Sequence, residues 1–90
     1  MHLEDVAAQQ LSATFKVQWQ CELENADHWA DYHESQQKKI ETAWQAMAHE
    51  VEVGTVDWPD TWLIDFVALV QINQQTSRRR RVRRVLISHQ

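Results

Sequence analysis

The residues of this sequence best suited to chemistry are six arginines close to its end. They lie between Arg78 and Arg84 and are interrupted only by Val82. Residues 1–77 hold three basic residues against thirteen carboxylates, while the remainder of the chain holds the six arginines and no carboxylate. So uneven a distribution indicates that the basic segment meets an anionic partner, either elsewhere in the fold or on a ligand.

An arginine run alone also fits a disordered tail, a localisation signal or a nucleic-acid patch. Two features favour an ordered strand. The run continues into the apolar, mainly β-branched residues 85–87, and residues 69–72 form a second strand-like segment, separated from the run by turn formers. Together they predict a β-hairpin. Alternation along a strand then places Arg80, Val82 and Arg84 on one face and Arg79, Arg81 and Arg83 on the opposite face.

The composition of the chain favours a single packed domain. It has 90 residues, 43% of them hydrophobic, with five Trp and only one Gly and one Pro. Disordered chains are poor in aromatic residues, so a folded core of modest size is expected. Cys21 is the single cysteine, which excludes an internal disulfide. No signal-like segment and no run of eighteen apolar residues are found, so we expect a soluble intracellular protein of the cytoplasm or nucleus, with no membrane partner.

The elements that must position the arginines begin at Phe15. We interpret residues 1–14 as a linker or short helix and residues 15–88 as the domain. From Phe15 to Glu24 apolar and polar residues alternate strictly, which predicts a strand whose inward face includes Trp19 and Cys21. A turn and a short strand, residues 29–32, are expected to follow.

One amphipathic helix is predicted from Glu34 to Glu50. Its apolar residues recur at helical spacing and must cover one face of a sheet. They are Ile40, Ala43, Trp44, Met47 and Ala48. Further strands are predicted at residues 51–56 and 61–67. Asp65 interrupts the second of these, so its carboxylate is expected to be paired or to lie at a bend. The result is an α+β domain of five or six antiparallel strands and one helix packed on the sheet.

These residues resemble a WWE domain over about Phe15 to Ile87. The resemblance is carried by Val17 and Trp19, Trp29-Ala30-Asp31-Tyr32, Ile40, Ala43 and Trp44, Trp62-Leu63-Ile64-Asp65-Phe66, Gln71-Ile72-Asn73, Thr76, Arg80 and Val82-Arg83-Arg84. Three departures accompany it. Val17 stands where the family commonly has its first tryptophan, the loop between Trp19 and Trp29 is long, and His33 replaces the usual helix-capping serine.

The resemblance implies a half-barrel of antiparallel strands with the helix across its concave side. It also implies a pocket at one end that binds ADP-ribose, either the internal iso-ADP-ribose unit of poly(ADP-ribose) or a terminal unit. Such domains are usually attached to ubiquitin ligases or to ADP-ribosyltransferases and have no catalysis or cofactor of their own. The expected partners are therefore ADP-ribose or poly(ADP-ribose) and other domains of the parent protein.

The resemblance further implies which residues bind the ligand. Trp19 and Trp62 are expected to stack on adenine, Gln71 to bond a base edge or ribose hydroxyl, and Arg80 to contact phosphate through its planar guanidinium. Asn73 is expected to hold the hairpin turn. Two further residues are expected at the rim, Arg84 and Tyr32, the latter as rim or core. Trp29 and Trp44 are expected in the core.

Other functions are disfavoured by what the sequence lacks. The five histidines and Cys21 show no metal-ligand spacing, and a glycine-rich phosphate loop, a nucleophile motif and paired carboxylates are missing, so an enzyme is not expected. Two alternatives stay open. The arginine run is compatible with RNA binding, although the net charge of −4 counts against it. The domain is also compatible with a protein-interaction module whose pocket has decayed.

Overall fold

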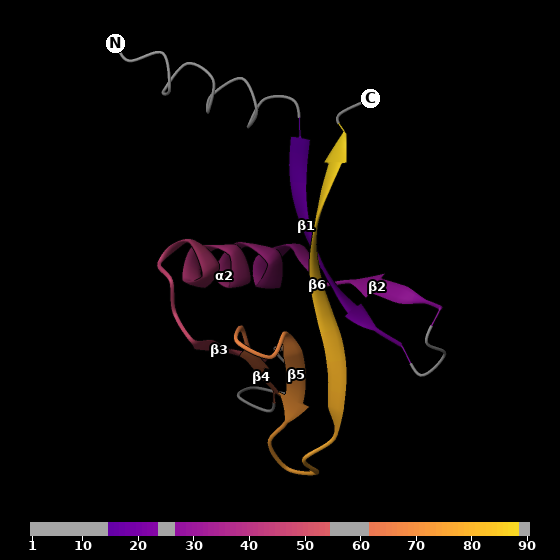
Figure 1. Ribbon diagram of the computed structural model, residues 1–90, viewed down its shortest axis with the longest axis vertical. Helices are drawn as coiled ribbons and strands as arrows, with labels where there is room; N and C mark the ends of the chain where they lie inside the picture. Colours follow the sequence, from indigo (N-terminus) through magenta and orange to yellow (C-terminus); the bar gives the residue numbers. More distant parts are fainter. Residues whose placement is uncertain (1–14, 24–26, 55–61, 89–90) are drawn as a thin grey trace.

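The computed structural model describes residues 15–23, 27–54 and 62–88. Within these ranges the chain forms one helix and a six-stranded antiparallel sheet in the order β2-β1-β6-β5-β4-β3 (Figure 1). The elements are β1 (Phe15–Glu22), β2 (Trp29–Asp31), α2 (Glu34–Gln45), β3 (Glu50–Val53), β4 (Trp62–Asp65), β5 (Val70–Asn73) and β6 (Arg79–Ser88). The predicted α+β class and antiparallel sheet are confirmed. Residues 1–14 and the predicted strand ends at Glu24, Val56 and Thr61 lie outside the described residues.

Strand β6 joins the two halves of the sheet. Its first residues pair with β5, with Gln71 opposite Arg80, and most of its length pairs with β1, from Cys21 opposite Val82 to Phe15 opposite Ser88. Helix α2 packs on both β1 and β3, which lie near opposite ends of the strand order. The sheet must therefore curve around the helix. It stays open, as a half-barrel.

The core lies between the helix and the concave face of the sheet. Its fully buried side chains are Trp19, Ile40, Val53 and Ile64, with Tyr32, Phe66 and Val82 buried around them. The ring of Trp19 packs at 5.5 Å from Trp44 and 5.6 Å from Phe66. Burying such aromatic side chains stabilises a small domain by about 1.5–3 kcal/mol each.

The helix begins as predicted but ends earlier, at Gln45 instead of Glu50. Two hydrogen bonds close its end, Met47 N to Trp44 O and Ala48 N to Ala43 O, while Met47 adopts a left-handed φ of 59°. This is a Schellman motif, which usually employs glycine at the left-handed position. The motif ends the helix and turns the chain into β3.

At the other end of α2, the side chain of His33 caps the start of the helix. Its Nδ1 accepts a hydrogen bond from Ser35 N at 3.3 Å, and Gln36 Oε1 accepts one from His33 N at 3.0 Å. This reciprocal arrangement satisfies two backbone groups that a helix start leaves unpaired. The departure at His33 therefore leaves the helix start intact.

One aspartate and one asparagine side chain shape the turns beside the last strands. The Oδ1 atom of Asp65 accepts hydrogen bonds from Val67 N and Ala68 N, so this carboxylate lies at a bend, one of the two outcomes expected. The bend ends β4 before the predicted Val67. The Oδ1 atom of Asn73 accepts hydrogen bonds from the next turn, Gln75 N and Thr76 N, which confirms its predicted role in the hairpin.

Two tryptophans expected in the core lie elsewhere. Trp29 is half-buried, and the guanidinium group of Arg83 covers its ring at 4.2 Å. Trp44 packs edge-on against Trp19, yet 37% of it is exposed because it lies in the last turn of α2. The core assignment of both residues is therefore corrected. Within the described ranges, no helix is long and apolar enough to cross a membrane.

Candidate functional site

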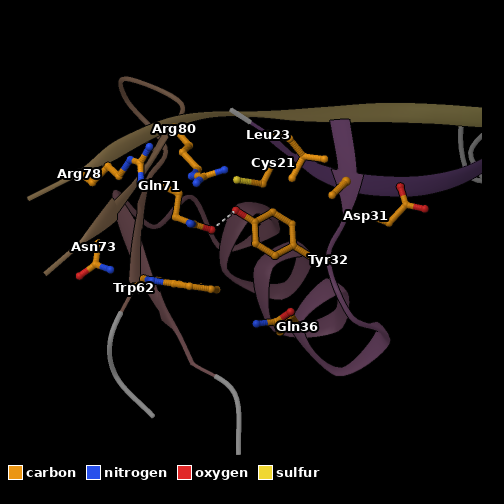
Figure 2. Close-up of a pocket in the computed structure, with 11 residues that line it drawn as sticks. Cys21, Leu23, Asp31, Tyr32, Gln36, Trp62, Gln71, Asn73, Arg78 and Arg80 are labelled. Carbon is orange, nitrogen blue, oxygen red and sulfur yellow. Dashed lines mark hydrogen bonds between the residues drawn. The ribbon is translucent and has the colours of Figure 1, made fainter. Parts of the chain in front are cut away.

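A cavity of about 400 Å³ opens where β1, β2, the start of α2, β4, β5 and β6 come together (Figure 2). It is lined by Cys21, Leu23, Ala30, Asp31, Tyr32, Gln36, Trp62, Gln71, Asn73, Arg78 and Arg80. A cavity of this volume suits a small molecule, since ligand pockets commonly measure about 300–1,000 Å³. The antiparallel register sets the positions of these residues, because Gln71 pairs with Arg80, Trp62 with Asn73, and Cys21 with Ala30.

The centre of the cavity wall is a hydrogen bond between two buried side chains. The hydroxyl of Tyr32 donates to Gln71 Oε1 at 2.6 Å, and the two residues are only 8% and 6% exposed. Burial raises the pKa of Tyr32 well above its ordinary value, so the phenol keeps its proton and remains a donor. Because the amide oxygen of Gln71 is engaged, its amide nitrogen is the group left to donate to a ligand.

Backbone contacts hold Tyr32 in place from the helix and from β1. Its N–H donates to the carbonyl of Trp19 at 3.1 Å, and its own carbonyl accepts a bond from Gln37 Nε2 at 3.0 Å. The side chain therefore enters the cavity from a fixed point directly after β2. Tyr32 was expected at the rim or in the core, and the structure places it in both, as a core residue whose hydroxyl lines the cavity.

Two arginines supply the positive charge of the cavity. Arg80 is half-buried on β6 and its Nη1 donates to the carbonyl of Glu22 at 3.4 Å, while Arg78 approaches from the hairpin turn just before the strand. Figure 2 shows Arg78 and Arg80 near Gln71. Planar guanidinium groups bind phosphate through paired, charge-assisted hydrogen bonds, so this side of the cavity suits an anion.

Trp62 provides a flat apolar surface in the same cavity. The residue is half-buried on β4, and Figure 2 shows its indole extending below Gln71 and Tyr32. An indole in such a position can stack on a heterocyclic base for about 1–3 kcal/mol. The cavity therefore combines an aromatic surface, an amide donor and two guanidinium groups.

The comparison with protein families agrees with this geometry. The sequence profile of the WWE domain matches residues 17–84, which is most of the chain. The chain belongs to the WWE family. WWE domains are protein-interaction and ADP-ribose-binding modules, and they are not catalytic. Among curated proteins, no sequence matches this WWE domain significantly.

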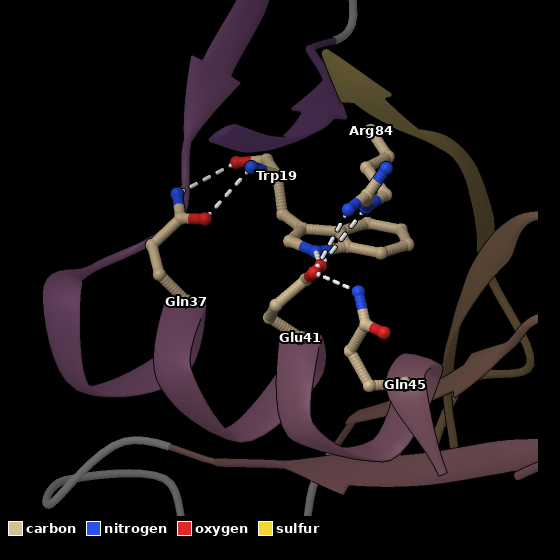
Figure 3. A network of polar contacts seen from close by, with 5 residues as sticks. All are labelled: Trp19, Gln37, Glu41, Gln45 and Arg84. Atoms are coloured by element: carbon tan, nitrogen blue, oxygen red, sulfur yellow. Dashed lines mark hydrogen bonds and ion pairs between the residues drawn. The ribbon is translucent and has the colours of Figure 1, made fainter. Parts of the chain in front are cut away.

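Trp19 does not line the cavity of this WWE domain. The residue is fully buried, and its indole Nε1 donates to Glu41 Oε1 at 2.9 Å (Figure 3). The Gln37 side chain also holds both backbone groups of Trp19. Gln37 Oε1 accepts a hydrogen bond from Trp19 N at 2.7 Å, and Gln37 Nε2 donates one to Trp19 O at 2.8 Å. The expected pocket position of Trp19 is therefore corrected, because α2 covers the inward face of β1 at this point.

Arg84 was expected at the cavity rim, and the structure corrects this too. It shares the face of Arg80 and Val82, as the alternation predicted, but it lies further along β6 and pairs with the helix. Its Nε and Nη2 atoms contact Glu41 Oε1 and Oε2 at 2.9 and 2.8 Å. Hydrogen bonds from Arg84 above all, and also from Gln45 and Trp19, hold the pKa of Glu41 at about 2, despite an opposing effect of burial.

Sequence reasoning missed several residues of the cavity, above all Cys21. Its alternation with polar neighbours placed it on the inward face of β1, but only its pairing with Ala30 brings it to the cavity. Burial raises the pKa of the Cys21 thiol, so it remains protonated and poorly nucleophilic at neutral pH. In the described part of the chain, no group of three or more His, Cys, Asp or Glu side chains is arranged to hold a metal ion.

Proposed function

We propose that this WWE domain binds an ADP-ribose unit in the cavity without altering it chemically. The observation that carries the proposal is the convergence of the Tyr32–Gln71 pair, Trp62 and Arg80 on one cavity of about 400 Å³. ADP-ribose offers an adenine face, ribose hydroxyls and two phosphates, and each has a complementary group in this set. Membership of the WWE family supports the choice of ligand.

Each of three side chains has a distinct role in the proposed complex. Trp62 stacks on the adenine ring, and the guanidinium of Arg80 binds a phosphate through two N–H groups. The amide nitrogen of Gln71 donates to a ribose hydroxyl or base edge. The Tyr32 hydroxyl orients this amide by its hydrogen bond to Gln71 Oε1. Because Gln71 is buried and its orientation fixed, little side-chain entropy is lost on binding, which favours affinity.

The proposal is tested by calorimetric titration of the domain with iso-ADP-ribose and, separately, with ADP-ribose. Binding of iso-ADP-ribose alone identifies a reader of internal poly(ADP-ribose) units, whereas preference for ADP-ribose identifies a reader of chain ends or single modifications. We expect Arg80→Ala to abolish binding. Arg80→Lys keeps the charge but loses the paired N–H geometry, so affinity is expected to fall by on the order of tenfold or more.

Arg79→Ala is the matched control for these variants. Arg79 neighbours Arg80 on β6 but points to the opposite face and does not line the cavity, so removal of the same charge should leave the affinity for a monomeric ligand unchanged. Equal losses in both variants would show that charge alone, and not the cavity, determines binding. If neither ligand binds at millimolar concentration while circular dichroism shows an intact fold, the domain is a protein-interaction module instead.

The setting of the domain is part of the same proposal. We place it within a larger intracellular protein of ADP-ribosylation or ubiquitination, in the cytoplasm or nucleus, where it would direct that protein to modified targets. Family membership and the non-catalytic character of WWE domains support this assignment. Colocalisation of the full-length protein with poly(ADP-ribose) in cells, and its loss in the Arg80→Ala variant, provide the cellular test.

A further inference from the structure

The outer face of β6 carries a row of arginines that the cavity does not use. Alternation along the strand directs Arg79, Arg81 and Arg83 away from the core, and all three are exposed. Successive members of this row are about 7 Å apart along the strand. Lys16 lies on the same face of the sheet, opposite Ile87. The row is therefore a regular positive surface on the side opposite the core.

Arg83 is held in a fixed orientation by its neighbours. Its guanidinium lies 4.2 Å from the ring centre of Trp29, and its Nε donates to Gln20 Oε1 at 2.8 Å. Gln20 in turn donates to Asp31 Oδ1 at 2.8 Å. A guanidinium stacked on an indole is ordered before any ligand arrives, and its plane is a surface on which a base can stack.

The other two arginines of the row are accessible to an anion. Arg81 bonds the Glu22 carboxylate through Nε and Nη2 and lies 5.6 Å from the ring centre of Trp29. Glu22 is only 18% exposed, but the Arg81 side chain is 64% exposed, so water screens the pair and the guanidinium is open to other anions. A phosphate can therefore compete for it. For Arg79, no hydrogen bond or ion pair is found within residues 15–23, 27–54 and 62–88.

The row is continuous with the cavity along one strand. Arg78 and Arg80 line the cavity, and Arg79 and Arg81, their immediate neighbours in sequence, face outward. Strand β6 begins at Arg79, directly after the hairpin turn. A flexible polyanion that leaves the cavity at Arg78 therefore reaches Arg79 by passing round this end of the sheet, without crossing the body of the domain.

We propose that Arg79, Arg81 and Arg83 bind the phosphates and bases of the ADP-ribose units adjoining the one held in the cavity. The inference rests on the proposed function and deepens it, since it makes the ligand an extended poly(ADP-ribose) chain. The nearby carboxylates of Glu22 and Asp31 weaken the row for a polyanion in free solution. A chain already held by the cavity presents its next phosphates at high effective concentration, which compensates for this weakness.

The test compares a monomeric and a polymeric ligand. Three proteins are titrated with iso-ADP-ribose and with poly(ADP-ribose) of about ten units: the wild-type domain, an Arg79→Ala/Arg83→Ala variant and a Lys38→Ala/Lys39→Ala control. The control loses the same charge from exposed positions on α2. We expect the arginine variant to keep its affinity for iso-ADP-ribose and to lose on the order of tenfold for the polymer. The slope of log K against log salt for the polymer should fall by about 0.7, because one phosphate contact, that of Arg79, is lost together with the base stacked on Arg83.

Each other outcome overturns a defined part of the reasoning. If the arginine variant keeps its polymer affinity and wild type binds iso-ADP-ribose, the proposed binding of the polymer by the arginine row is refuted, while the proposed function of the cavity stands. An equal loss of polymer affinity in the lysine control would show that the total charge of the domain, and not the arginine row, determines the effect. If single-stranded RNA of similar length binds as tightly as the polymer and loses the same affinity, the row is a nucleic-acid surface. If wild type binds neither ligand, both the row and the proposed function fail. Arg79→Ala alone serves as a second variant, because it leaves the Trp29 stack untouched.

Discussion

Replacement of Glu41 by glutamine should destabilise the fold in a manner that depends on pH. The carboxylate of Glu41 accepts four hydrogen bonds, one from Trp19, two from Arg84 and one from Gln45. A glutamine side chain keeps one oxygen but points an NH₂ group at donors that need an acceptor. Strand β6, which carries Arg84, and helix α2 therefore lose their main polar connection.

The magnitude follows from the pKa of this carboxyl. The difference between its ordinary value of 4.5 and about 2 in the folded protein corresponds to roughly 3 kcal/mol in favour of the ionised form. The Glu41 and Arg84 side chains are 25% and 26% exposed, so solvent screening reduces this figure. We expect Glu41→Gln to lower the free energy of unfolding by about 2 kcal/mol at pH 7.

The direction of the pH effect is set by the lowered pKa. Because the folded state holds the proton less tightly than the unfolded state, the stabilisation is complete above pH 4.5 and is lost as the pH falls from 4.5 towards about 2. At pH 3 roughly two fifths of it should remain. The difference between wild type and Glu41→Gln should therefore shrink to about 1 kcal/mol at that pH.

Urea denaturation followed by tryptophan fluorescence at pH 7 and pH 3 measures both quantities. Glu52→Gln is the control, because Glu52 is an exposed carboxylate on β3. It should change the free energy of unfolding by less than about 0.5 kcal/mol. A loss in Glu41→Gln as small as that of the control, or one equally large at both pH values, would refute the reasoning from the network.

Two further predictions concern single side chains. Tyr32→Phe removes the hydroxyl donor to Gln71 Oε1 and frees the Gln71 amide to rotate. Calorimetry should therefore show a loss of ADP-ribose affinity on the order of tenfold, and the free energy of unfolding should fall by about 1 kcal/mol. Unchanged affinity would mean that Gln71 needs no orientation by Tyr32. Met47→Gly should raise the free energy of unfolding by about 0.5–1 kcal/mol, because glycine adopts the left-handed φ of 59° without steric cost and the Met47 side chain is 87% exposed. A lower unfolding midpoint in urea would show that this side chain packs against the fold.

Much of the site was predictable from local patterns in the sequence. Alternation in the arginine run correctly separated Arg80 from its outward neighbours, and the hairpin predicted between the last two segments brings Gln71 opposite Arg80. These inferences succeed because strand periodicity and turn chemistry act over a few residues. The inward orientation of Cys21 followed from the same periodicity.

The errors arose where position depends on contacts between distant elements. Trp19 was correctly placed on the inward face of β1, but whether that face meets the helix or the cavity depends on where α2 crosses. Arg84 was misplaced for the same reason, since its partner Glu41 lies 43 residues away. Trp29 belongs to a strand of three residues, too short for alternation to reveal its face, and its cover comes from Arg83.

The pairing of Phe15 with Ser88 determines how the domain can be attached to other parts of a protein. Residues that face one another across antiparallel strands have Cα atoms about 5 Å apart, so the polypeptide enters and leaves this fold at nearly the same point. The cavity residue Cys21 lies six residues further along β1, about 20 Å from that point. Such a unit can be spliced into a surface loop of a host protein without spreading the loop ends, and it would then stand on a narrow two-stranded stalk with its binding end directed outward.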